Sequence, residues 1–170
     1  MFSIEEEVMA EGFTRVYCGK GKGKSRAALG LGISAAGSGN SVVIIQFLKN
    51  RNDEELEFLK RLEPEVKLFR FEKSSECFDD LSEEDKKEEV LNIRNGLNFA
   101  RKVLSTEGCN LLILDEVLGL VDQHIITTKE LIELIEVKDE DTALVLTGIT
   151  MNPQLSDYVD EIYNIDIVKV

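Results

Sequence analysis

Glycine and lysine alternate near the start of this chain in a pattern that suits phosphate binding. Residues 18–26 read CGKGKGKSR and carry four positive charges, although the chain of 170 residues has a net charge of −13. Glycine accepts positive φ, so successive N–H groups can point into one concavity that holds an anion. The preceding FTRVY is typical of a strand, and the following SRAALGLGISAAG is typical of a helix. This order of strand, loop and helix predicts a P-loop, in which the helix N-terminus also attracts phosphate.

The residue types within this loop match the chemistry of nucleotide phosphates. Lys24 would neutralise phosphate charge, and the Ser25 hydroxyl is placed to ligate magnesium. The residues predicted to bind the nucleotide are Gly19, Lys20, Gly21, Lys22, Gly23, Lys24 and Ser25. Three residues separate Gly19 from Gly23, whereas the general pattern has four. The alternative interpretation is a surface turn rich in glycine and lysine.

A second candidate site follows the apolar run LLIL at residues 111–114. Asp115 and Glu116 come directly after this predicted buried strand, which is typical of a Walker B element. In a P-loop fold such a strand lies near the loop, so the Asp115 carboxylate can hold the magnesium shell. Glu116 can bind metal, order a ligand or act as a base. The alternative is a helix N-cap and a solvated acid after an ordinary core strand.

The remaining elements predict a scaffold that can bring these two sites together. Further strands are expected at residues 42–45, 66–71 and 143–146, and helices at 53–62, 83–106 and 127–137. Residues 72–81 are expected to form an irregular surface loop. Because the apolar runs indicate strands covered on both faces, we predict a three-layer α/β/α fold of the P-loop NTPase type (RecA-like) with a mostly parallel central sheet. The whole chain, 1–170, is expected to form one domain with an N-terminal arm at 1–12.

Composition excludes several other classes of protein. No apolar run approaches the roughly 20 residues of a membrane span, and the acidic N-terminus does not resemble a secretory signal, so a cytoplasmic protein without membrane contact is expected. The net negative charge argues against nucleic-acid binding. Three cysteines without a CxxC pair and a single histidine, His124, do not suggest a disulfide framework or a zinc site.

Four stretches together resemble a known family. GKGKGKSRAALG at 19–30 is similar to the loop GNGKGKTTAALG of the P-loop type of ATP:corrinoid (cob(I)alamin) adenosyltransferases, including the shortened glycine spacing. VVIIQFLKN, LLILDE and LTGITMNPQLSDYVDEI also resemble segments of that family. The resemblance covers roughly residues 13 to 165.

The resemblance implies a reaction and a site. Family members use the Co(I) of a reduced corrinoid as a nucleophile on the 5′ carbon of ATP and release triphosphate. Carried over by position, the catalytic residues would be Lys24, Asp115 and Glu116, and Mg²⁺ would be arranged by Ser25, Asp115 and Glu116. Phe78 matches an aromatic residue that faces the corrinoid, so the expected ligands are ATP, Mg²⁺ and a corrinoid.

Some positions depart from the family pattern and keep other functions open. Arg26 replaces a threonine, Ile149 replaces the arginine of an LTGR motif, and Asp80 falls where the family has a tryptophan that this chain lacks. One alternative is therefore an ATP-binding regulatory or partner module without corrinoid activity, and another is a P-loop ATPase in which Glu116 activates water. The family also predicts a homodimer in which the N-terminal arm helps to close the active site.

Overall fold

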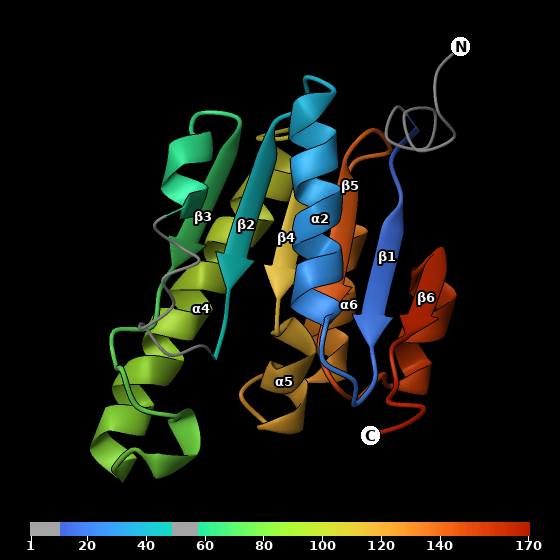
Figure 1. Ribbon diagram of the computed structural model, residues 1–170. Coiled ribbons are helices and arrows are strands. Elements are labelled where there is room, and N and C mark those ends of the chain that lie inside the picture. Colours follow the sequence, from blue (N-terminus) through green and yellow to red (C-terminus); the bar gives the residue numbers. More distant parts are fainter. Residues whose placement is uncertain (1–10, 49–57) are drawn as a thin grey trace.

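The fold is a parallel β-sheet covered by helices on both faces (Figure 1). The computed structural model describes residues 11–48 and 58–170. Its six described strands are all parallel and follow the order β3-β2-β4-β5-β1-β6. They are β1 (Thr14–Cys18), β2 (Val42–Gln46), β3 (Val66–Arg70), β4 (Leu111–Asp115), β5 (Ala143–Thr147) and β6 (Glu161–Asn164). The predicted fold class is confirmed.

Helices on the two faces of the sheet make the outer layers (Figure 1). Helix α2 (Lys24–Gly37) packs on one face through small residues. A Cβ atom at Gly32 would lie 3.2 Å from Ile113 Cδ1, so the glycine allows the helix to approach the sheet closely. Helices α4 (Glu83–Ser105) and α6 (Thr128–Glu136) cover the opposite face.

Side chains at the N-termini of α4 and α6 cap these two helices. The Ser82 side chain accepts a hydrogen bond from the Asp85 N–H. Thr127 and Glu130 form a complete capping box at the start of α6. These contacts satisfy N–H groups that have no partner within a helix.

Two elements were not expected from the sequence. The segment after Glu116 begins with the short helix α5 (Val117–Asp122), whose apolar residues Val117 and Leu118 are buried. Strand β6 adds an edge strand beside β1, although its residues are half-buried or exposed. Its burial pattern explains the miss, because no continuous apolar run marks it.

Two further short elements connect the strands, and one predicted helix lies partly outside the described residues. Half of the expected helix 53–62, residues 53–57, lies outside the described residues, and the described half ends in the 3₁₀ turn Lys60–Leu62. A longer 3₁₀ segment, Pro153–Tyr158, precedes β6. None of the helices in the described part of the chain combines the length and the apolar character needed to cross a bilayer.

Candidate functional site

On strands β2, β4 and β5, the face of the sheet that packs on α2 is apolar until its last row, where the side chains become polar. Val42 and Ile44 belong to the core beneath α2, and Gln46 is the next residue of β2 on the same face. Gln46 pairs in register with Arg70 on β3 and with Asp115 on β4. Parallel strands place their carboxyl ends at one edge, so this polar row lies where open α/β sheets bind ligands.

Asp115 lies at the centre of the polar row and receives hydrogen bonds from three segments of the chain. Its Oδ1 accepts from Ser25 Oγ and from Thr147 Oγ1, both at 2.7 Å. Its Oδ2 accepts from Gln46 Nε2 at 3.2 Å. The side chain is buried, with 2% of its surface exposed. The structure therefore brings together Ser25 and Asp115, which are 90 residues apart in the sequence.

Glu116 follows Asp115 in a left-handed backbone conformation and begins α5. Its φ is 61°, and its N–H donates to Thr147 Oγ1 at 2.8 Å. The Thr147 hydroxyl thus accepts from Glu116 and donates to Asp115. Through this one fully buried hydroxyl, β5 sets the position of both acidic residues.

The glycine-rich loop leads directly into the N-terminus of α2. Gly19 and Gly23 have φ values of 108° and 127°, which residues other than glycine rarely adopt. Lys24 is buried at 8% exposure, and its Nζ donates to the Gly21 carbonyl at 2.7 Å. Since the N–H groups of a helix's first turn have no acceptor within the helix, they and the Lys24 ammonium can bind an anion here.

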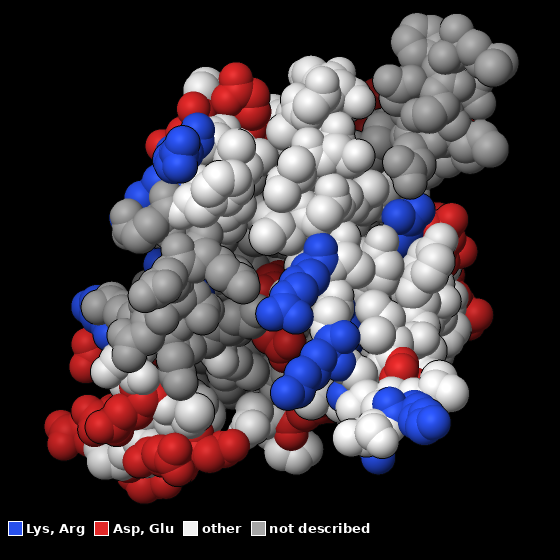
Figure 2. Space-filling model, viewed as in Figure 1, with Lys and Arg blue, Asp and Glu red and all other residues white. Residues whose placement is uncertain are grey.

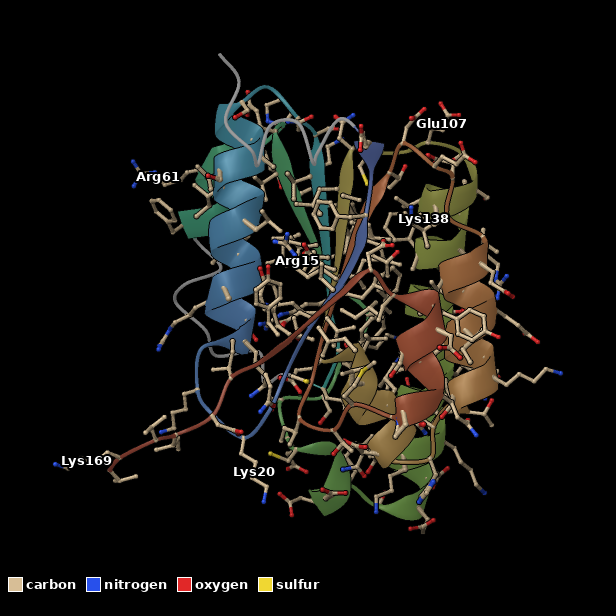
Figure 3. The ribbon with its side chains drawn as sticks, turned by 90° about the vertical axis from the view of Figure 1, so that its right-hand side faces the viewer. Arg15, Lys20, Arg61, Glu107, Lys138 and Lys169 are labelled. Atoms are coloured by element: carbon tan, nitrogen blue, oxygen red, sulfur yellow. The ribbon has the colours of Figure 1, made fainter. Side chains whose placement is uncertain are left out.

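The segments after β5 and β6 both contact this loop, an arrangement that the sequence did not indicate. Gly19 N–H donates to the Ile149 carbonyl at 2.9 Å, and Gly21 N–H donates to the Ile165 carbonyl at 2.8 Å. A Cβ atom on Gly21 would lie 2.7 Å from Ile165 O, so this glycine is required for space. In Figure 3, Lys20 lies beyond the lower end of α2, on the side where the C-terminal segment runs toward Lys169. Phosphate binding by Gly19 and Gly21 stays a prediction.

Phe78 lies at the same end of the molecule, in the loop between β3 and α4. It begins a 3₁₀ turn, Phe78–Asp80, and packs partly on the main core. The cavity beside it, shared with Glu72 and Glu89, has a volume of about 20 Å³, which is close to the space of one water molecule. A corrinoid at Phe78 would therefore have to contact its outer surface, and the predicted role stays untested.

Buried carboxylates hold this loop in place. The Glu89 carboxylate accepts from the N–H groups of Lys73 at 3.1 Å and Ser74 at 2.9 Å, and Glu72 accepts from the Leu48 N–H at 3.0 Å. Burial raises the pKa of the Glu72 carboxyl, and the nearby Glu89 charge raises it further. The loop expected at 72–81 is thus tied to both α4 and the end of β2.

The donor set around Asp115 suits magnesium. Hydroxyl and carboxylate oxygens are hard ligands, and Mg²⁺ is usually held by one or two protein groups together with substrate phosphates. Within residues 11–48 and 58–170, no group of three or more His, Cys, Asp and Glu side chains could hold a metal by itself. Oxygens of phosphate and water would therefore complete a magnesium shell that includes Ser25 and Asp115.

Charge is distributed unevenly around this edge of the sheet. Figure 2 shows Lys and Arg side chains over the lower end of α2, directly beside acidic side chains. Acidic side chains dominate the region around the start of α4, at the lower left. The basic residues thus lie over the predicted phosphate site of an otherwise acidic protein.

Sequence reasoning identified Ser25 and Asp115 but did not assign roles to three residues that contact or support Asp115. These are Gln46, Arg70 and Thr147. A polar residue directly after an apolar parallel strand is a signal that could have indicated Gln46. His124, the single histidine of the sequence, is exposed just after α5.

Comparison with known proteins supports both the fold and the family. The profile of the family described as ATP:corrinoid adenosyltransferase BtuR/CobO/CobP matches residues 10–170. No curated protein matches the chain. Among solved structures, EssC (ATPases 2 and 3) from Geobacillus thermodenitrificans is similar, with a TM-score of 0.50 and 16% identity over 94% of this chain and 33% of that one. The chain thus spans about one third of the EssC structure, and this likeness shows the fold alone. Since the family profile covers nearly the whole chain, including the glycine-rich loop and the strand that ends at Asp115, the protein belongs to the ATP:corrinoid adenosyltransferase family.

Proposed function

We propose that this protein transfers the 5′-deoxyadenosyl group of ATP to a reduced corrinoid. In this reaction an electron pair of Co(I) forms the bond to C5′, the bond between C5′ and oxygen breaks, and its electron pair leaves with triphosphate. The observation that carries the proposal is the meeting of Ser25 and Asp115 at the N-terminus of α2, beside the buried Lys24. This arrangement stabilises negative charge on a leaving triphosphate and requires no activated water.

The proposed roles follow from the contacts. Lys24 and the N–H groups at the start of α2 bind the triphosphate, and the loop glycines allow the backbone to approach it. Ser25 and Asp115, with Glu116 beside them, hold Mg²⁺, which when bound adds positive charge against the leaving group. Phe78, in the loop held by Glu89, contacts the corrinoid.

A second candidate function is an ATP-binding module that does not act on corrinoids. This function is favoured by Ile149, which stands in the place of the family's arginine. The Ile149 side chain is 53% exposed, and its carbonyl accepts a hydrogen bond from the Gly19 N–H. A P-loop ATPase using Glu116 as the base is a third candidate, because Glu116 lies at the edge of the sheet next to Asp115.

One assay separates these candidates. Reduced cobalamin or an incomplete corrinoid is mixed with ATP and Mg²⁺, and the absorbance of Co(I) is followed while the phosphate products are identified. Loss of the Co(I) spectrum with release of triphosphate supports the transferase. Release of orthophosphate without corrinoid alkylation indicates the ATPase, and ATP binding without either product indicates the regulatory module.

A further inference from the structure

Three residues in one row of the sheet form a continuous hydrogen-bonded chain that ends on Asp115. Arg70 Nε donates to Gln46 Oε1 at 2.8 Å, and Gln46 Nε2 donates to Asp115 Oδ2 at 3.2 Å. The register explains the chain, because Gln46 pairs with Arg70 on one side and with Asp115 on the other. The contacts therefore follow from neighbouring positions in parallel strands.

The chemistry of the two ends determines how the Gln46 amide is oriented. A guanidinium group has only donors, and an ionised carboxylate has only acceptors. An amide between them satisfies both only if its oxygen faces Arg70 and its nitrogen faces Asp115. Arg70 thus prevents the amide from turning over, which would direct the Gln46 oxygen at the Asp115 carboxylate.

The orientation of Asp115 matters because its two carboxylate oxygens have different partners. Oδ1 accepts from Ser25 and Thr147, so it lies on the side of the phosphate loop. Gln46 holds Oδ2 on the opposite side, toward β2. A carboxylate held at both oxygens cannot rotate freely, so less conformational freedom is lost when it takes its place in a metal shell.

We propose that Arg70 and Gln46 are positioning residues that hold the Asp115 carboxylate ready for magnesium bound with the nucleotide. The proposal rests on the nucleotide and magnesium site of the proposed function and adds two residues that do not touch the substrate themselves. Arg70 acts through Gln46, and Gln46 acts through Asp115 Oδ2. The effect is confined to the metal, since neither residue belongs to the glycine-rich loop.

The test compares magnesium affinity in variants that remove one contact each. Gln46→Met keeps the side-chain length and removes both hydrogen bonds, and Arg70→Met removes the donor to Gln46. Calorimetry with ATP is performed with Mg²⁺ and with EDTA. We expect Gln46→Met to weaken Mg²⁺ binding in the presence of ATP by about tenfold, the usual size for a hydrogen bond to a charged group. Affinity for metal-free ATP should stay within about twofold of the wild type.

A double variant tests whether Arg70 and Gln46 act as a relay, in which Arg70 affects Asp115 only through Gln46, or contribute to Mg²⁺ binding separately. If Arg70 acts through Gln46, the variant Gln46→Met/Arg70→Met should bind Mg²⁺ no more weakly than Gln46→Met alone. Gln154→Met, on the exposed 3₁₀ segment before β6, is the matched control and should behave as the wild type. If Gln46→Met does not fold, Gln46→Asn replaces it, because the shorter amide cannot span both partners.

The outcomes separate this proposal from the proposed function. Unchanged Mg²⁺ affinity in Gln46→Met, equal losses with and without metal, or additive losses in the double variant would each overturn the relay. Wild-type protein that binds ATP with Mg²⁺ but does not alkylate a corrinoid would overturn the proposed function and leave the relay intact. Wild-type protein that binds no nucleotide would overturn both.

Discussion

Lys24 joins the glycine-rich loop to the first turn of α2 and carries a buried positive charge. Its Nζ donates a hydrogen bond to Gly21 O. When ATP binds, this hydrogen bond would be replaced by one to a phosphate oxygen. We expect Lys24→Ala to weaken ATP binding by about 1.5 to 3 kcal/mol without unfolding the protein, because the Lys24 ammonium bonds to the loop carbonyl of Gly21 and both apolar core clusters are built from other residues. Calorimetry measures the affinity, and Lys129→Ala, an exposed lysine of α6, serves as the control. An unchanged affinity would contradict the P-loop assignment.

Asp115 is the residue through which magnesium and the nucleotide should be coupled. Asp115→Asn keeps the size of the side chain and removes its charge, so we expect it to weaken ATP binding in the presence of Mg²⁺ more than in EDTA. The two conditions can be compared by calorimetry on the same preparation. Equal losses with and without Mg²⁺ would show that Asp115 only supports Ser25 and Thr147.

Glu72 should make stability depend on pH. Because burial raises the pKa of Glu72, the folded protein binds this proton more tightly than the unfolded chain. Its contribution to stability is therefore lost as the pH rises from the ordinary value of 4.5 through the raised pKa. Glu72→Gln keeps an acceptor for the Leu48 N–H and removes the charge.

We accordingly expect the Glu72→Gln variant to be more stable than the wild type at pH 7. Below about pH 4 the two proteins should be equally stable, because the protonated Glu72 carboxyl is then as uncharged as the amide that replaces it. Urea unfolding at the two pH values measures the difference. Glu88→Gln is the control, since Glu88 is exposed and on the same helix as Glu89. A Glu72→Gln variant no more stable than the wild type at pH 7 would show that the raised pKa does not affect folding.

Among the elements, α6 offers the clearest test of local sequence signals. Its capping box joins the Thr127 and Glu130 side chains to each other's N–H groups, and Glu130 also pairs with Arg94 at 3.0 Å. Thr127→Ala should lower the free energy of unfolding by about 1 kcal/mol, whereas Thr127→Ser should keep most of the stabilisation that the cap provides. Urea denaturation measures both variants, and equal losses would mean that the hydroxyl does not cap the helix.

The elements also explain which parts of the fold the sequence could reveal. Strands β2, β4 and β5 are marked by apolar runs because both of their faces are covered. Strand β6 has no such run, since it is an edge strand with exposed side chains, and it forms because β1 offers an unpaired edge. Pairing with a neighbour is a tertiary property that local periodicity does not contain.

The molecule as a whole collects its polar groups at one edge of the sheet. All the described strands are parallel, so their carboxyl ends, and the loops that follow them, lie at the same end (Figure 1). The hydrogen-bonded group around Asp115 therefore combines residues from five elements, α2, β2, β3, β4 and β5, and not from one motif. We further propose that residues 1–170 act as one nucleotide-binding domain and that the protein is a cytoplasmic homodimer.

The predicted N-terminal arm provides a test of that assembly. Residues 1–10 lie outside the described residues. Gly12, just before β1, fits closely against the carbonyl of Glu140. Deletion of residues 1–11 should leave ATP affinity nearly unchanged, because the phosphate site lies at the other end of β1. It should reduce corrinoid turnover if the arm closes the site of a second subunit. Sedimentation of both proteins would report the dimer, and full turnover by the truncated protein would contradict a role for the arm.

The sequence by itself indicated the glycine-rich loop, the buried strand that ends at Asp115 and the fold class, and the structure confirms the fold class. These features have local signatures, namely glycine spacing, continuous apolar runs and helix caps, each of which can be recognised within a short stretch of sequence. The resemblance to the corrinoid adenosyltransferases rests on the same stretches, and the family profile confirms it.

The tertiary structure alone decided how Asp115 is held and what surrounds the loop. Gln46 and Arg70 are ordinary strand residues in the sequence, and only the order β3-β2-β4 places them in one row with Asp115. Likewise, Gly21 requires its small size because Ile165, far along the chain, packs against it. Which strands become neighbours depends on the burial of the whole sheet, and for that reason no local pattern could show these contacts.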